Sequence, residues 1–261
     1  MDSEPMSSPT PPLFELRHVS HRYGSRGRSV LALDDINLAI DRGERVGIVG
    51  ESGSGKSTMA RLLVALVQPS EGEILFHGEP LATKRAALLD FRHAVQIVFQ
   101  DPFGSLDPRL SIGDSVAEPL RALGIQGDRD ARVRELIDAV GLPANSLSLY
   151  PHQLSGGQRQ RVAIARALAP GPSTLIADEA VSALDVSVRA QVLNVIANLV
   201  QELGLTLIFI SHDMSVVRHV CSRVIVLYRG QVVEDNQTDQ IFENPQHPYT
   251  QTLLASTPRL E

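Results

Sequence analysis

The residues best suited to chemistry form one glycine-rich run that ends in a lysine and a serine. It reads Gly50-Glu51-Ser52-Gly53-Ser54-Gly55-Lys56-Ser57 and is followed by Thr58. In such a loop, backbone N–H groups surround phosphate oxygens, and a helix that begins there adds the positive end of its dipole. Lys56 is expected to reach the β- and γ-phosphates, and Ser57 to offer its hydroxyl to Mg²⁺. The run therefore predicts a nucleoside triphosphate site.

The flanking sequence favours this interpretation over a glycine-rich turn with a solvated lysine. The apolar run from Val46 to Val49 predicts a buried strand that ends at Gly50, and Thr58 through Val67 predicts a helix. A strand, a glycine-rich loop and a helix in this order are the setting that a phosphate-binding loop requires.

A pair of carboxylates follows a second apolar run. In Leu175-Ile176-Ala177-Asp178-Glu179 the strand is expected to deliver both acids at its C-terminal end, the edge where ligands bind in α/β sheets. Asp178 suits a Mg²⁺ site. Glu179 points differently and suits the general base for an attacking water, an effect worth ~10²–10⁴-fold. A helix cap or an ion pair is the alternative for such a pair, and the preceding glycine-rich loop makes it the weaker one.

A third stretch, Leu154-Ser155-Gly156-Gly157-Gln158, precedes the strong helix formers of residues 159–169. Ser155 is a good N-cap, and the two glycines leave the N–H groups of the helix start accessible. The stretch predicts a second anion site at a helix N-terminus.

Composition sets limits on the function. The 261 residues are 43% hydrophobic and 21% charged, with a net charge of −6, so no overall basic field attracts nucleic acid or anionic lipid. The single cysteine, Cys221, excludes an intrachain disulfide and a multi-cysteine metal site, and indicates a reducing compartment. We expect Cys221 to be a small buried apolar residue.

No stretch is long and apolar enough to span a bilayer, so a membrane role requires a partner. Residues 1–12 are rich in Ser and Pro and lack an apolar core, which predicts a disordered lead and not a signal peptide.

The order of elements predicts an α/β fold. Strands are expected at 14–19, 36–40, 46–49, 72–76, 94–99, 174–177, 205–210 and 223–227, with a helix at 188–203 and helical segments over about 101–169. Strands that alternate with helices predict a mostly parallel sheet interrupted by a helical insertion.

These residues together resemble the ATPases of ABC transporters from Leu13 to about Pro258. The 154–158 stretch is similar to the family's signature motif, and the other family motifs follow in the expected order. They are Tyr23 as the aromatic residue that stacks on adenine, Gln100 as the glutamine that touches Mg²⁺ and the permease, Ser182-Ala183-Leu184-Asp185 as the D-loop, and His212 as the histidine that contacts the γ-phosphate.

The resemblance implies a P-loop NTPase domain over 13–258 with an N-terminal antiparallel β subdomain and an α-helical subdomain at about 101–169. It implies ATP and Mg²⁺ as ligands, with Ser57, Gln100 and Asp178 at the metal and Glu179 and His212 in catalysis. Two subunits, of the same or a similar chain, pack head to tail. The 155–158 turn of one then caps the γ-phosphate held by Lys56 of the other, with Asp185 at the shared site.

Three stretches are similar to the oligopeptide, dipeptide and nickel importer branch: 100–109, 178–188 and 244–254. This implies two permease subunits, an extracytoplasmic binding protein reached through them, and a peripheral place on the cytoplasmic face of the inner membrane. The tail at 244–261 is short, so we expect no regulatory domain and no iron–sulfur cluster. His247-Pro248-Tyr249 is expected to cap the last helix; contact with a substrate or effector is the alternative.

Two other functions fit the same motifs less well. Soluble ABC-type ATPases that act on nucleic acid or ribosomes usually carry two cassettes, a coiled-coil insertion or basic extensions, and none is visible in this sequence. The exporter branch usually fuses the cassette to membrane helices, which are also missing.

Overall fold

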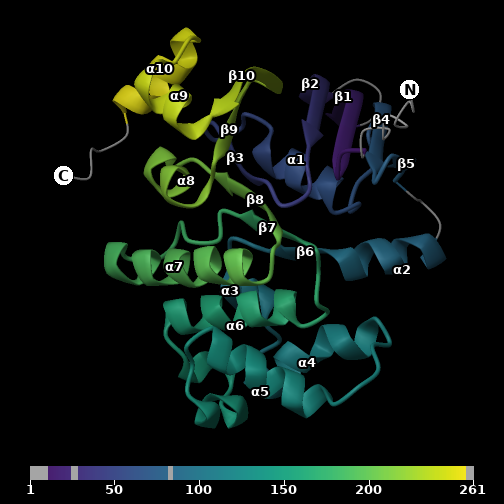
Figure 1. Cartoon of the computed structure of the whole chain (residues 1–261), viewed down its shortest axis with the longest axis vertical. Helices are drawn as coiled ribbons and strands as arrows, with labels where there is room; N and C mark the ends of the chain where they lie inside the picture. The colour runs from purple at the N-terminus through teal and green to yellow at the C-terminus, as the bar shows by residue number, and fades with distance from the viewer. Residues whose placement is uncertain (1–10, 25–28, 82–84, 257–261) are drawn as a thin grey trace, which may run out of the picture.

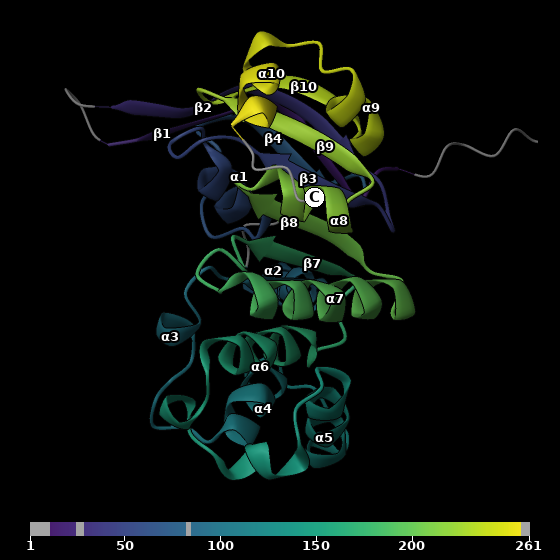
Figure 2. The ribbon, with the colours of Figure 1, turned by 90° about the vertical axis from the view of Figure 1, so that its left-hand side faces the viewer.

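The structure, a computed structural model, describes residues 11–24, 29–81 and 85–256. Two β-sheets and the helices around them lie at one end of the molecule, and a group of helices lies at the other (Figure 1). Helix α7 (Val186–Glu202) lies between the two ends in both views (Figures 1 and 2).

The larger sheet has six strands in the order β10-β9-β3-β8-β7-β6. Neighbours from β9 to β6 pair in parallel, and β10 pairs antiparallel with β9 at the edge. The mostly parallel sheet predicted from the sequence is confirmed. Its strands are β3 (Arg45–Val49), β6 (Val95–Val98), β7 (Thr174–Asp178), β8 (Thr206–Ser211), β9 (Arg223–Tyr228) and β10 (Gln231–Gln237).

The apolar runs become central strands because both faces of this sheet are covered. Every residue of β8 is buried. Leu207 and Phe209 pack into a core shared with α6 and α7, while Ile208 and Ile210 pack into a core shared with α1 and the second sheet. Because successive side chains of a strand point to opposite faces of the sheet, β8 contributes to a hydrophobic core on each face.

The second sheet is antiparallel, in the order β2-β1-β4-β5. The predicted strands at 14–19 and 36–40 were too short. Irregular pairing lies between Leu16 and Arg22, and both His18 (φ +51°) and Asp35 (φ +49°) have left-handed backbone. Such bulges interrupt the polar–apolar alternation from which strands are recognised. The bounds are β1 (Phe14–Tyr23), β2 (Val30–Ile40), β4 (Glu71–Phe76) and β5 (Glu79–Pro80).

Between β6 and β7 the chain forms the helical end of the molecule (Figure 2). Side chains of Ser111, Asp128 and Ser155 accept hydrogen bonds from the first turns of α4, α5 and α6, which explains where these helices begin. The elements are α3 (Pro102–Ser105), α4 (Ile112–Ala122), α5 (Arg129–Ala139), the 3₁₀ turns at Ala144–Ser148 and Pro151–Gln153, and α6 (Gly156–Leu168).

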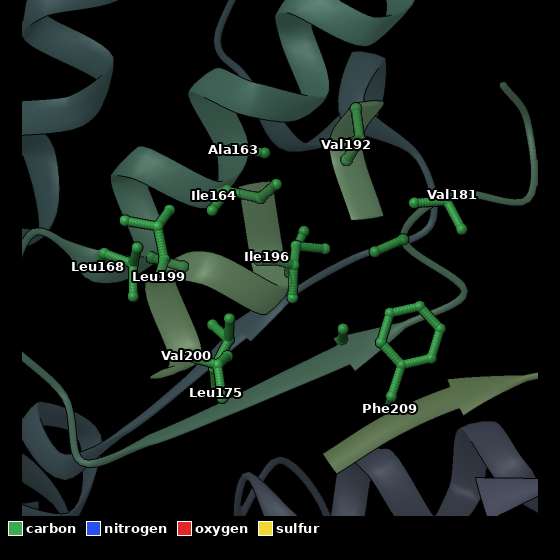
Figure 3. Packing of buried hydrophobic residues seen from close by; sticks show 14 of the residues in the cluster. Ala163, Ile164, Leu168, Leu175, Val181, Val192, Ile196, Leu199, Val200 and Phe209 are labelled. Atoms are coloured by element: carbon green, nitrogen blue, oxygen red, sulfur yellow. The ribbon is translucent and has the colours of Figure 1, made fainter. Parts of the chain in front are cut away.

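Helix α7 is buried on two flanks. Figure 3 shows its Val192, Ile196 and Leu199 between α6 and the sheet, close to Leu175 of β7 and Phe209 of β8. The helix therefore joins the helical end to the larger sheet through a continuous apolar core.

The remaining helices are α1 (Lys56–Leu63), α2 (Arg85–Ala94), α8 (Met214–Val220), α9 (Thr238–Glu243) and α10 (Pro248–Ala255). The expected helix at 58–67 was wrong at both ends: α1 begins at Lys56 and ends at Leu63, and Ala65 has φ +54°. Cys221 is buried after α8, as predicted. Within the described ranges, no helix has the length and apolar character that a membrane crossing needs.

Candidate functional site

The glycine-rich run forms a loop between β3 and α1. Gly50 has φ +155°, and a Cβ atom there would lie 2.2 Å from the carbonyl oxygen of Leu227. Gly55 has φ +111° at the N-cap of α1, where a Cβ atom would lie 2.7 Å from the carbonyl oxygen of Ala32. Only glycine fits these two positions without displacing the backbone beside it, so the loop depends on both.

Lys56 is held inside this loop. It is the first residue of α1 and is 5% exposed, and its Nζ donates to the carbonyl oxygens of Gly50 (2.7 Å) and Glu51 (2.8 Å). Burial lowers the pKa of the Lys56 ammonium, whereas the carboxylates of Glu179, Asp178 and Glu51 act in the opposite direction. A buried cation that bonds only to its own loop is suited to release those carbonyls for phosphate oxygens.

Two further predicted residues lie along α1. Ser57 is exposed at the start of the helix, and Thr58 is buried one position later. Tyr23, at the end of β1, accepts a hydrogen bond from Arg61 on the same helix (3.5 Å). Burial raises the pKa of Tyr23, but hydrogen bonds with Thr58 and Arg61 outweigh it and lower the pKa overall. Tyr23 therefore packs on the helix that begins at the glycine-rich loop.

Asp178 ends β7 with an unsatisfied oxygen. Its Oδ1 is buried and has no hydrogen-bond partner among the described residues. Burial raises the pKa of Asp178, the neighbouring Glu179 raises it further, and Lys56 and Arg61 oppose both. A buried carboxylate oxygen without a partner favours a cation as its ligand. Asp178, Ser57 and Gln100 all offer oxygen atoms, which Mg²⁺ prefers, so this donor set fits the metal.

Glu179 and His212 lie beside each other at the ends of adjacent strands. His212 follows β8, and its Nδ1 lies 3.3 Å from Oε2 of Glu179. Glu179 has φ +48°, and its backbone N–H donates to the carbonyl of Ile210. Left-handed backbone in a residue other than glycine is uncommon and tends to occur at functional sites. Both side chains line a cavity of about 590 Å³ together with Glu51, Ser52, Asp213, Leu253 and Ser256.

Gln100 is connected to Glu179 through one serine. It follows β6, and its Nε2 donates to Oγ of Ser182 at 3.4 Å. The Ser182 hydroxyl in turn donates to the carbonyl oxygen of Glu179 at 3.0 Å. The glutamine therefore lies within two hydrogen bonds of the predicted base.

The 155–158 turn lies elsewhere. Ser155 and Gln158 form a reciprocal capping box at the start of α6 (2.9 and 3.3 Å). Asp185 caps α7 by accepting from the N–H of Val188. Among the described residues, none of this turn lines the cavity at Glu179, and α6 lies on the side of α7 away from α1 (Figures 1 and 2). The structure thus brings together the glycine-rich loop, Asp178, Glu179, Gln100 and His212, but not the 155–158 turn.

Sequence reasoning missed two contributions to the cavity. Asp213, next to His212, lines it and pairs with Arg189 of α7 at 2.9 Å. Leu253 and Ser256 bring the last helix, α10, to the same cavity. The similarity of residues 244–254 to one importer branch was a signal for this region, but it contained no information about where the helix packs.

Comparison with known proteins identifies the family of this chain. The profile of the ABC transporter family matches residues 33–182, and that of the oligopeptide/dipeptide transporter C-terminal region matches residues 233–261. A putative peptide import ATP-binding protein of Brucella ovis is 46% identical over 250 residues, which are 95% of this chain and 79% of that protein. The oligopeptide transport ATP-binding protein OppF of Bacillus subtilis is 44% identical over 254 residues (95% and 83%).

The glutathione import ATP-binding protein GsiA of Salmonella choleraesuis is 48% identical over 257 residues, 95% of this chain but 41% of that protein. Among solved structures, the dimeric ATP-binding cassette MJ0796 bound to ADP and Pi superposes with a TM-score of 0.78 at 33% identity, covering 86% of this chain and 98% of that one. CbiO1 of Clostridium perfringens, part of an ABC transporter complex, gives 0.79 at 29% identity (90% and 92%).

The fold, the glycine-rich loop, the strand-end acids and these similarities lead to one assignment. This chain belongs to the ABC transporter family, as one of its ATP-binding, ATP-hydrolysing subunits.

Proposed function

We propose that this chain binds Mg–ATP at the glycine-rich loop and hydrolyses it to energise a peptide-class importer. The observation that supports this most directly is that Lys56 and Asp178 lie close enough to Glu179 to act on one another electrostatically, while Glu179 and His212 line the cavity beside the loop. A loop lysine, a half-buried acid with one unpartnered oxygen and a strand-end carboxylate next to an imidazole are groups suited to phosphoryl transfer to water.

In the proposed binding step, Lys56 exchanges the carbonyls of Gly50 and Glu51 for the β- and γ-phosphates, and Tyr23 stacks on adenine. The exchange is electrostatically favourable, because a buried ammonium gains charged partners in place of neutral ones. Ser57, Gln100 and Asp178 would hold Mg²⁺, which neutralises charge on the phosphates.

In the proposed hydrolysis step, Glu179 orients a water and accepts its proton as the oxygen attacks the γ-phosphorus. The bond from phosphorus to the β–γ bridging oxygen breaks, which yields ADP and phosphate. His212 orients the Glu179 carboxylate by donating from Nδ1–H, and in the imidazolium form its Nε2–H also donates a hydrogen bond toward the γ-phosphate. The 3.3 Å separation of His212 and Glu179 supports their acting as a unit.

The separation of the 155–158 turn from the cavity supports a two-chain site. That turn presents a helix N-terminus at a distance from the cavity beside Lys56. It is therefore suited to bind the γ-phosphate of an ATP held by a second subunit that packs head to tail with this one. The dimeric state of the cassette MJ0796 bound to ADP and Pi is consistent with this arrangement. ATP then joins the two subunits, and hydrolysis lets them separate.

The transported solute is proposed from the relatives. Those reported above are named for the import of peptides, oligopeptides or glutathione, itself a tripeptide, and the C-terminal region matches the oligopeptide/dipeptide profile. We therefore propose two permease subunits, a binding protein outside the membrane, and a place for this chain on the cytoplasmic face of the membrane.

Nucleotide titration of the purified chain tests the ATP site. Wild type is expected to bind ATP in the presence of Mg²⁺, and Lys56→Ala to bind at least ~10-fold more weakly, since it removes a charge-assisted contact. Equal affinities would contradict the site, and a wild type without affinity for adenine nucleotides would contradict the function.

Co-purification from the source cell tests the transport role. Recovery of permease subunits, with peptide uptake that depends on this chain, supports the proposal. Recovery of ribosomes or DNA in their place would support the soluble ABC-type ATPase and overturn it.

A further inference from the structure

The C-terminal helix touches the phosphate-binding loop directly. The hydroxyl of Tyr249, in the first turn of α10, accepts a hydrogen bond of 2.8 Å from the backbone N–H of Glu51. The two residues are 198 positions apart in the chain. Glu51 is the second residue of the loop, directly after Gly50, so the bond lies where the loop leaves β3.

Tyr249 is fixed on the larger sheet by its surroundings. Its ring packs against that of Tyr228, the last residue of β9, with centroids 4.1 Å apart and an interplanar angle of 31°. The start of α10 is anchored as well, because the carboxylate of Glu234 on β10 accepts from the N–H groups of Gln246 (2.8 Å) and His247 (3.0 Å). The hydroxyl is therefore a fixed acceptor.

Glu51 is held on both sides of its own backbone. Its carbonyl accepts from Lys56, and its N–H donates to Tyr249. When Lys56 turns to a phosphate, the first of these bonds is lost and the second remains. The other end of the loop has a similar tie, since the N–H of Gly230, in the turn between β9 and β10, donates to the carbonyl of Ser54 at 2.9 Å. Two hydrogen bonds from the C-terminal part of the chain, one to the Tyr249 side chain and one from the Gly230 backbone, thus tie the backbone of the loop at both ends.

The same helix also forms part of the cavity wall. Leu253 and Ser256, at the C-terminal end of α10, line the cavity with Glu179 and His212. Burial raises the pKa of the Tyr249 phenol, so the hydroxyl stays neutral. Helix α10 therefore contacts the loop at one end and the hydrolysis site at the other.

We propose that Tyr249 is a positioning residue for ATP, whose hydroxyl holds the Glu51 peptide so that the phosphate-binding loop is formed before nucleotide arrives. The inference rests on the proposed ATP site and adds a residue to it. A loop that is already formed loses less conformational freedom when ATP binds than a loop that must first be ordered. The bond from Tyr249 is therefore expected to affect ATP affinity more than kcat.

Replacement of the phenol by a phenyl ring tests the bond alone. Tyr249→Phe keeps the packing against Tyr228 and is expected to weaken ATP binding, or raise KM, by about three- to tenfold with kcat within about twofold of wild type. The matched control is Tyr228→Phe, which removes a hydroxyl from the same aromatic pair, one for which the structure records no hydrogen bond to the loop. Its affinity is expected to equal that of wild type.

A double-mutant cycle identifies the partner. In a Glu51→Pro background the donor is absent, so adding Tyr249→Phe is expected to change ATP affinity by less than about twofold. Additive effects of the two substitutions would overturn the proposed bond.

The outcomes separate this inference from the function on which it rests. If wild type binds ATP and Tyr249→Phe binds equally well, the positioning role is overturned, even if its thermal unfolding midpoint has fallen. If wild type binds no ATP, the proposed function is overturned and the role of Tyr249 with it.

Discussion

The imidazole of His212 lies 3.3 Å from the Glu179 carboxylate, and the two residues follow adjacent parallel strands, β8 and β7. Glu179 reaches this place with left-handed backbone, φ +48°, while its N–H is bonded to the carbonyl of Ile210 on β8. The neighbouring strand therefore supplies both the imidazole and the backbone contact that holds the carboxylate. We predict the effects of substitutions at Glu179, His212, Asp178 and Gly157 from this contact and from others described above.

Glu179→Gln is expected to reduce kcat for ATP hydrolysis by ~10²–10⁴-fold, because the amide cannot accept the proton of the attacking water. ATP affinity should be retained, since the loop and Lys56 are unchanged. Phosphate release gives kcat and nucleotide titration gives affinity; on a sizing column with ATP, the variant should elute as a dimer. Wild-type turnover would remove Glu179 from the role of base.

His212→Ala is expected to lower kcat more than it lowers ATP affinity, because the imidazole contacts Glu179 and not the phosphate loop. His219→Ala is the matched control. That histidine bonds to Asn194 of α7 at 2.9 Å, away from the cavity lining, and its loss should leave kcat unchanged. Equal effects of the two substitutions would contradict a specific role for His212.

Asp178→Asn is expected to abolish Mg²⁺-dependent hydrolysis yet raise the thermal unfolding midpoint of the nucleotide-free protein at pH 7. Burial and Glu179 raise the pKa of Asp178 above 3.8, so its ionised form destabilises the folded state at neutral pH. As pH falls through the raised pKa, wild type takes up a proton and this penalty disappears. The difference in midpoint should therefore shrink toward pH 4 in calorimetry, and a difference that grows would contradict the assignment.

Gly157→Ala is expected to destabilise the fold by about 1–3 kcal/mol through overpacking. A Cβ atom there would lie 2.2 Å from Cγ1 of Val188, where α6 meets α7. Gly156→Ala is the matched control, because its Cβ atom would meet Leu184 at 3.6 Å, an ordinary contact. Urea unfolding of both variants measures the difference, and equal stabilities would show that α6 and α7 can separate at no cost.

The central strands were predictable because burial on both faces makes continuous apolar runs. The strands predicted at 174–177 and 223–227 end one residue before β7 and β9 do, and the strand predicted at 205–210 is shifted by one residue at both ends relative to β8. β10 was not predicted: it is a polar strand at the edge of the sheet, and its residues are exposed or half-buried. Its existence depends on pairing with β9, which is a tertiary contact.

The difference between local patterns and tertiary contacts also explains which site residues could be predicted. The glycine-rich loop and the strand-end acids are local patterns with fixed spacing, so the residues themselves suggested them, whereas His212 came from the resemblance to the family. Tyr249 was expected to help cap the last helix, with contact to a substrate or effector as the alternative. His247 does provide that cap by accepting from the Tyr249 N–H, but the contact of the Tyr249 hydroxyl with Glu51 spans most of the chain and leaves no local pattern.

Helix α7 determines how the two ends of the molecule can move. Its buried side chains face α6 on one flank and the larger sheet on the other. Sliding either layer over it exposes apolar surface, at a cost of roughly 25 cal/mol for each Å². A swing of the helical end that carries α7 with it avoids that cost on the flank that faces α6 but not on the flank that faces the larger sheet, and it displaces Asp185, the N-cap residue of this helix. Because Asp185 is one of the residues proposed for a site shared with a second subunit, such a swing would move that residue relative to the larger sheet.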